Sequence, residues 1–232
     1  MIIRQTFIAA ALVLGTLPAA TLGAPGADAL ANCSSCHALA KPANADLDRL
    51  MTRNGPDLYY AGVKFKKEWL VAWLQNPTVI RPGGVMFVRA VKAGAPGTTD
   101  TIDASKVSAH PKLSAADAAA AADALMALGA SESLVQKGAF KQEPINAMMA
   151  GLLFNKLRGC SSCHSVKAGT GGISGPELYT AAERLQPDYM VEYIRDPQKF
   201  DPHIWMPKLE LTDSDIQKLA GYLASLQQGG AK

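Results

Sequence analysis

The pentapeptide Cys-Ser-Ser-Cys-His occurs at residues 33–37 and again, unchanged, at residues 160–164. These two copies contain all four cysteines of the 232-residue chain. The length leaves room for one large domain or two small ones. A motif that occurs twice and uses every cysteine predicts that the same local chemistry takes place at two positions.

The Cys-x-x-Cys-His spacing is typical of covalent attachment of a c-type haem. The two thiols add to the vinyl groups of one porphyrin, and the imidazole that follows binds the iron. Two disulfides, a tetrathiolate zinc site or a thioredoxin-like redox pair are alternatives. They are disfavoured because the pairs lie far apart and both precede a histidine. We therefore expect two haem c groups, held by Cys33 and Cys36 and by Cys160 and Cys163.

The residues downstream of each motif also match. Gly-Pro-x-Leu-Tyr occurs at 55–59 and 175–179, and an aromatic segment that ends before a proline occurs at 69–77 and 189–197. Met86 and Met206 follow at the same distance in each copy. Thirty residues with matched spacing and no gap indicate a tandem duplication.

Helical patterns dominate both copies. We expect helices at 66–75, 146–158 and 188–195, and a closing helix in each copy that is capped by Ser114 or Thr212 with an aspartate three residues later. No segment alternates like a strand over any length. The fold class is therefore predicted to be all-α, with two small helical domains at residues 25–128 and 146–232 and a polar linker at 129–145.

The order of these features resembles class I cytochrome c, twice, over residues 27–228, and so a dihaem member of that family without an assigned subfamily. The resemblance implies histidine ligands on the proximal side of each iron, each held by the carbonyl of the Gly-Pro proline, and methionine ligands on the distal side. The residues implied are His37, Pro56 and Met86 for the first haem, and His164, Pro176 and Met206 for the second.

One irregularity concerns the distal ligand of the first haem. About twenty extra residues separate Met86 from Leu113, and the insertion ends in a stretch at 108–113 whose Pro-Lys-Leu tail also follows Met206. His110 stands there in the place of Met206. The longer matched spacing favours Met86, with His110 in an exposed loop. Ligation by His110, or an open or water-bound iron, is the alternative. His203 is expected in a solvent-facing loop.

The N-terminus reads as an export signal at residues 1–24. Arg4 precedes an apolar run from Phe7 to Leu17, which is too short to span a membrane, and Ala24 offers a cleavage site. We expect a periplasmic protein with no membrane span after cleavage, or one anchored by an uncleaved signal. The net charge of +3 is small and evenly spread, which argues against nucleic-acid binding.

Two six-coordinate haems suit electron transfer, so no catalytic residue is predicted. We expect a carrier, or the cytochrome subunit of an oxidoreductase, that passes single electrons from a dehydrogenase to an oxidase or reductase. The alternatives are an enzyme, peroxidase-like or sulfur-compound oxidising, with catalysis at the first haem, and a haem-based sensor. Lys64, Lys66 and Lys67 form a basic cluster that could face an acidic redox partner or simply be solvated.

Overall fold

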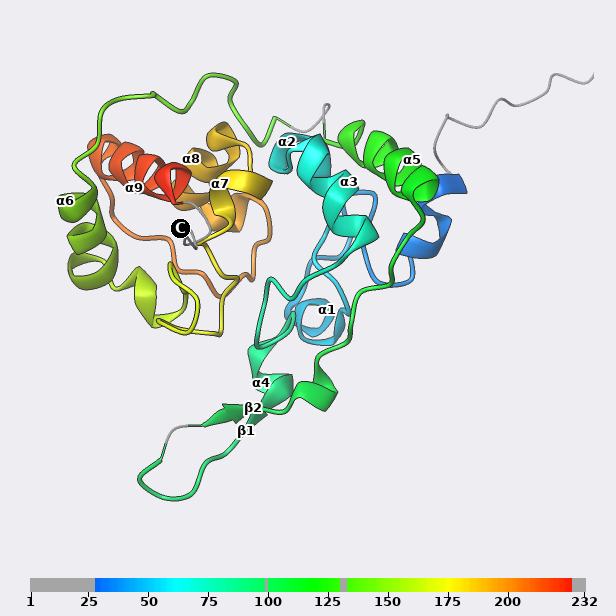
Figure 1. Ribbon diagram of the computed structural model, residues 1–232, viewed down its shortest axis with the longest axis horizontal. Coiled ribbons are helices and arrows are strands. Elements are labelled where there is room, and N and C mark those ends of the chain that lie inside the picture. Colours follow the sequence, from blue (N-terminus) through cyan, green and yellow to red (C-terminus); the bar gives the residue numbers. More distant parts are fainter. Residues whose placement is uncertain (1–27, 99, 130–132, 227–232) are drawn as a thin grey trace, which may run out of the picture.

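The computed structural model describes residues 28–98, 100–129 and 133–226, so the expected export signal lies outside the described residues. The described chain is mostly helical and forms two halves, 28–129 and 133–226, which lie side by side (Figure 1). The first half consists of a 3₁₀ turn Asp28–Cys33, α1 (Leu47–Thr52), α2 (Ala61–Lys64), α3 (Lys67–Gln75), α4 (Phe87–Ala90), a 3₁₀ turn Ala104–Lys106 and α5 (Ala115–Met126).

The second half begins with α6 (Ala147–Leu152), which continues as a π-turn over Leu153–Leu157. It then contains a 3₁₀ turn Cys160–Ser162, α7 (Ala181–Arg184), α8 (Pro187–Arg195), a 3₁₀ turn Pro197–Lys199 and α9 (Asp213–Ser225). In each half the closing helix packs mainly against the helix that ends before the second proline of the repeat, α5 against α3 and α9 against α8.

The predicted caps of the closing helices are confirmed. The Ser114 hydroxyl accepts a hydrogen bond from the Asp117 amide at 3.2 Å, and the Thr212 hydroxyl accepts one from the Asp215 amide at 3.1 Å. Each bond satisfies an amide that has no partner inside its helix, which fixes where the helix begins. The buried residues of α5 are mostly alanine, whereas α9 buries larger side chains.

The all-α expectation is wrong at one place. Val91–Lys92 (β1) pairs antiparallel with Thr101–Ile102 (β2), and the hairpin projects away from both halves beyond α4 (Figure 1). Strands of two residues are too short to show an alternating pattern in the sequence. The hairpin accounts for most of the insertion that follows Met86, because the 3₁₀ turn Ala104–Lys106 comes directly after it.

The two halves join through backbone hydrogen bonds that run in both directions. Phe65 and Leu185 form an antiparallel bridge, with the Lys66 amide donating to the Arg184 carbonyl at 3.0 Å and the Gln186 amide donating to the Lys64 carbonyl at 2.9 Å. Matching side-chain bonds flank the bridge, since Lys66 Nζ donates to Ala182 O and Gln186 Nε2 donates to Gly62 O, each at 2.7 Å. The junction is therefore nearly two-fold symmetric.

Aromatic side chains fill the space beside this bridge. Tyr60 and Tyr189 stack with ring centres 6.2 Å apart, and Phe200 packs on both. Tyr59 reaches across the junction, and its hydroxyl donates to the Phe200 carbonyl at 2.9 Å. Burial raises the pKa of Tyr60 and of Tyr189 well above the usual value. The two halves thus share one apolar core rather than touching only at their surfaces.

The described part of the expected linker packs against the second half. The Asp188 carboxylate accepts hydrogen bonds from the Gly138 and Phe140 amides, each at 2.8 Å, and Leu134 and Ala139 are buried. Within residues 28–98, 100–129 and 133–226, every helix is too short or too polar to cross a membrane.

Candidate haem sites

The two Cys-Ser-Ser-Cys-His motifs fold into the same turn. The amide of the histidine donates to the carbonyl of the first cysteine at 2.9 Å for His37 and at 3.0 Å for His164. All four thiols are free, and in each motif the first cysteine is half-buried and the second exposed. Burial raises the pKa of the Cys33 and Cys160 thiols. Each turn therefore holds two thiols and one imidazole close together, as covalent haem attachment requires.

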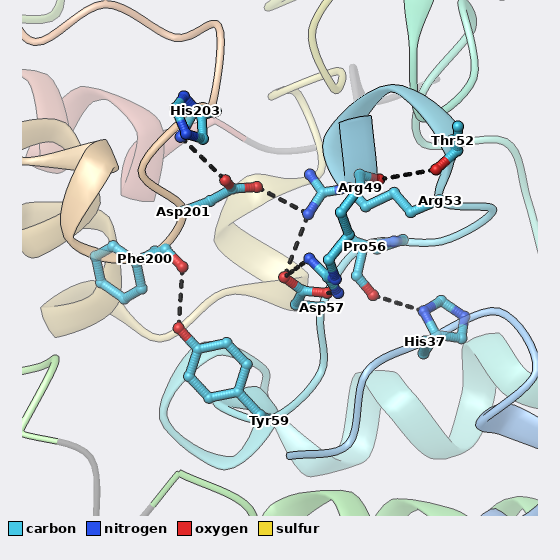
Figure 2. Close-up of polar contacts among 10 residues, drawn as sticks. All are labelled: His37, Arg49, Thr52, Arg53, Pro56, Asp57, Tyr59, Phe200, Asp201 and His203. Atoms are coloured by element: carbon cyan, nitrogen blue, oxygen red, sulfur yellow. Dashed lines mark hydrogen bonds and ion pairs between the residues drawn. The ribbon is translucent and has the colours of Figure 1, made fainter. Parts of the chain in front are cut away.

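Each imidazole is held by the carbonyl that the resemblance implies. His37 Nδ1 lies 2.7 Å from the Pro56 oxygen (Figure 2), and His164 Nδ1 lies 2.8 Å from the Pro176 oxygen. With the proton on Nδ1, the lone pair of Nε2 is left for a metal. Burial lowers the pKa of both histidines, against the opposing effect of the proline carbonyl, which favours the neutral ring that binds iron.

Glycine precedes each proline because the imidazole rests on it. A Cβ on Gly55 would lie 2.5 Å from His37 Cε1, and one on Gly175 would lie 2.5 Å from His164 Cε1. Both distances are far below van der Waals contact, so a side chain at either position would displace the ring. This contact explains why glycine occupies the same position in both copies of the repeat.

On the distal side of the second half, Met206 is half-buried and its carbonyl accepts a hydrogen bond from Gln198 Nε2 at 2.8 Å. A cavity of about 370 Å³ adjoins His164 and is lined in part by Asn155, Val166 and Thr170. His203 is exposed, as predicted. The ligand role of Met206 stays a prediction.

The distal side of the first half differs from the expectation in one respect. Met86 is only 7% exposed and immediately precedes α4. His110 was expected in an exposed loop, but it is half-buried against Trp73, with ring centres 4.6 Å apart. Its ring centre lies 6.3 Å from that of His37. The contact could not be foreseen because it depends on how the insertion folds back onto α3.

An ion-pair network that the sequence analysis did not predict links the two sites. Asp57, which follows Pro56, is buried and pairs with Arg49 and Arg53 (Figure 2). Arg53 also pairs at 2.8 Å with Asp201, which lies on the loop that leads to Met206. The equivalent carboxylate of the second half, Glu177, instead pairs with Arg184 and Thr180 inside its own half.

Each lysine of the basic cluster has a contact within the protein. Lys64 Nζ lies 5.4, 4.8 and 5.6 Å from the ring centres of Tyr60, Phe65 and Tyr189, and burial, with Arg81 and Arg184 nearby, lowers its pKa to about 7. Lys66 is bound at the junction, and Lys67 pairs with Asp123. In the described part of the chain, no three histidine, cysteine or acidic side chains gather as metal ligands.

A comparison with protein-family models matches residues 150–227 to cytochrome c. A cytochrome c domain is therefore recognised in the second half, with haem c at the second motif and electron transfer as the indicated activity. The first motif lies outside the matched residues. No match was found among curated proteins or among solved structures.

Proposed function

We propose that the chain is an exported dihaem c-type cytochrome that carries single electrons between a donor dehydrogenase and an oxidase or reductase. Haem 1 is bound at Cys33 and Cys36, and haem 2 at Cys160 and Cys163. His37 and His164 would hold the irons, and each haem would supply a one-electron redox centre between a reduced donor protein and an oxidised acceptor. The chain works in the periplasm, either as a soluble carrier or as the cytochrome subunit of a larger complex.

The observation that carries this proposal is the agreement between the two proximal sides. Both motifs make the same turn, both imidazoles use Nδ1 for a proline carbonyl, and both rings rest on a glycine. Only the second motif lies in the recognised cytochrome c domain. An arrangement that supports haem there supports haem equally at the first motif.

The charges at the junction add independent support. Burial, with Arg81 and Arg184 nearby, lowers the pKa of Lys64, and burial also lowers the pKa of Arg184. Among the described residues, no carboxylate forms an ion pair with Lys64. Arg184 is buried and Lys64 and Arg81 are half-buried, and such a group of cations is unfavourable unless negative charge offsets it. A haem carries two propionates, and bound haem would supply negative charge of this kind.

The test is a haem count combined with a redox titration of the purified full-length protein. We expect two haems per chain from the pyridine haemochrome spectrum, and two one-electron steps in a spectroelectrochemical titration. One haem per chain would contradict the dihaem carrier. Binding of cyanide or carbon monoxide by one haem of the unmodified protein at neutral pH would instead favour the enzyme or sensor alternative.

A further inference from the structure

We propose that His110, and not Met86, is the distal ligand of haem 1, so that this haem is bis-histidine ligated while haem 2 has histidine and methionine. The inference rests on the proposed dihaem function and assigns the one ligand that the sequence left open.

The two histidines of the first half lie at the distance that a shared metal ion would set. Two imidazoles that bind one metal ion from opposite sides, each by a bond of about 2 Å, have ring centres roughly 6 Å apart. The ring centres of His37 and His110 are 6.3 Å apart, with the ring planes at 43°. The two histidines come from chain segments that are far apart in the sequence, and the fold brings them to the separation that a shared iron requires.

The hydrogen bonds of the two histidines also place the ring proton of each on Nδ1. His110 Nδ1 lies 2.9 Å from the Pro111 carbonyl oxygen, so that nitrogen carries the proton, as it does in His37 and His164. Among the described residues, Nε2 of His37 and Nε2 of His110 have no hydrogen-bond partner. A neutral imidazole with its second nitrogen bound to a carbonyl is the form that ligates metals.

The structure also holds His110 in place. The Leu113 amide donates to the Leu74 carbonyl at 2.9 Å, which ties the stretch after His110 to the end of α3. Trp73, on the same end of α3, packs against the His110 ring and is itself fixed by a bond from its Nε1 to the Thr78 carbonyl. A ligand needs such support because an imidazole on a mobile loop would bind iron weakly.

The surroundings of Met86 argue the other way. Its side chain is covered by protein, at 7% exposed, whereas His37, His110, His164 and Met206 all keep uncovered surface that a bound group could contact. The chain directly after Met86 forms α4, where Arg89 donates to the Arg53 carbonyl at 2.9 Å and so binds this segment to the end of α1. Met86 is therefore assigned a packing role.

The position of each ligand relative to its closing helix agrees with this assignment. His110 stands shortly before the cap of α5, as Met206 stands shortly before the cap of α9. Met86 is separated from α5 by α4, the β1–β2 hairpin and a 3₁₀ turn. The β1–β2 hairpin is thus an insertion between Met86 and His110, and the ligand follows the hairpin in the sequence.

Bis-histidine ligation sets a direction for electrons. Thioether sulfur favours ferrous iron, so a histidine–methionine haem has the higher potential of the two. The iron held by His37 and His110 would then have the lower potential, which would favour electron flow from the first half to the second. The donor would dock on the first half and the acceptor on the second.

The experiment measures the methionine-to-iron charge-transfer band of the oxidised full-length protein, per haem counted by pyridine haemochrome. The variants are Met86→Leu, Met206→Leu and His110→Met. With two haems bound, we expect the band intensity of one haem in the unmodified protein, no change in Met86→Leu, and complete loss in Met206→Leu. His110→Met should double the intensity, because it offers a second thioether.

Two results would overturn the inference, and they are distinguishable. In the first, two haems are bound, the charge-transfer band has the intensity of two haems, and Met86→Leu halves it. This result would leave the dihaem function intact and would identify Met86 as the distal ligand of haem 1. One haem per chain would remove the dihaem function itself. Should His110→Met not fold, electron paramagnetic resonance of Met86→Leu decides, since a bis-histidine spectrum unchanged from the parent supports His110 and an altered one opposes it.

Discussion

The two halves of the molecule agree closely on one side of each site and differ on the other. On the proximal side, a Cβ added to Gly55 or to Gly175 would meet the same two imidazole atoms, Cε1 and Nδ1, at nearly the same distances. Beyond this shared turn, Met206 lies on the short segment before α9, whereas the first half contains the β1–β2 hairpin and packs His110 against Trp73. If both motifs bind haem as proposed, covalent attachment would constrain the turn around each histidine, and the segments that differ would be where a redox potential can be set without disturbing the fold.

The largest expected effect tests whether the halves are equivalent in binding. We compare Cys33→Ser/Cys36→Ser with Cys160→Ser/Cys163→Ser. Each double variant should lose one of two haems, and the affected half should unfold, because a small domain depends on a buried porphyrin for much of its apolar contact. Pyridine haemochrome spectra and circular dichroism measure both. If only Cys160→Ser/Cys163→Ser loses haem, the matching geometry of the two motifs does not make them equivalent in haem binding.

A smaller effect concerns the difference in how the two buried carboxylates are paired. Arg53→Met leaves Asp57 without this partner and removes the pair with Asp201, so we expect a loss of about 3–5 kcal/mol in unfolding free energy. Denaturant unfolding of the holoprotein measures it. The control is Lys208→Met, which breaks an exposed pair with Asp196 and should cost less than about 1 kcal/mol. Equal losses would contradict a bridging role for Arg53.

The glycines under the imidazoles give a matched pair. Gly55→Ala and Gly175→Ala each force a methyl group into a histidine ring, and we expect each to cost about 1–3 kcal/mol. Gly151→Ala is the control, since its methyl meets Tyr222 at an ordinary 3.6 Å within α6 and should stabilise by about 0.5–1 kcal/mol. Thermal unfolding measures all three. Unequal costs at Gly55 and Gly175 would weaken the equivalence of the proximal sides.

The smallest expected effect concerns the closing helices. Ser114→Ala and Thr212→Ala each remove one cap and should each lower stability by about 1 kcal/mol, because one helix amide loses its partner. Chemical denaturation is precise enough to compare them. A cost at Thr212 with none at Ser114 would show that the alanine-rich α5 does not need its cap.

Local signals were sufficient to predict much of this structure. The caps at Ser114 and Thr212, the helices before Pro77 and Pro197, and the turn of each cysteine motif all depend on neighbours within a few residues. The family resemblance also placed the imidazoles on the correct carbonyls, which is a contact over 19 residues for His37 and 12 for His164. These parts follow from short motifs with a fixed geometry.

The features that could not be predicted depend on long-range packing. The contact of His110 with Trp73 requires the insertion to fold as a hairpin and return to α3. The pairing of Arg53 with Asp201 and the enclosure of Lys64 depend on how the halves meet. The sequence neighbours of His110, Arg53 and Lys64 do not specify the partner of any of them. The sequence therefore predicts such polar side chains to lie on the surface.

The backbone bridge between Phe65 and Leu185 is self-complementary. An edge that makes the same hydrogen bonds in both directions fits a second copy of itself, as in an isologous dimer interface. A chain with only one half would therefore have an exposed edge that favours homodimers at high concentration. Joining the halves in one chain raises their effective concentration, so the pair closes within a single molecule even when the protein is dilute.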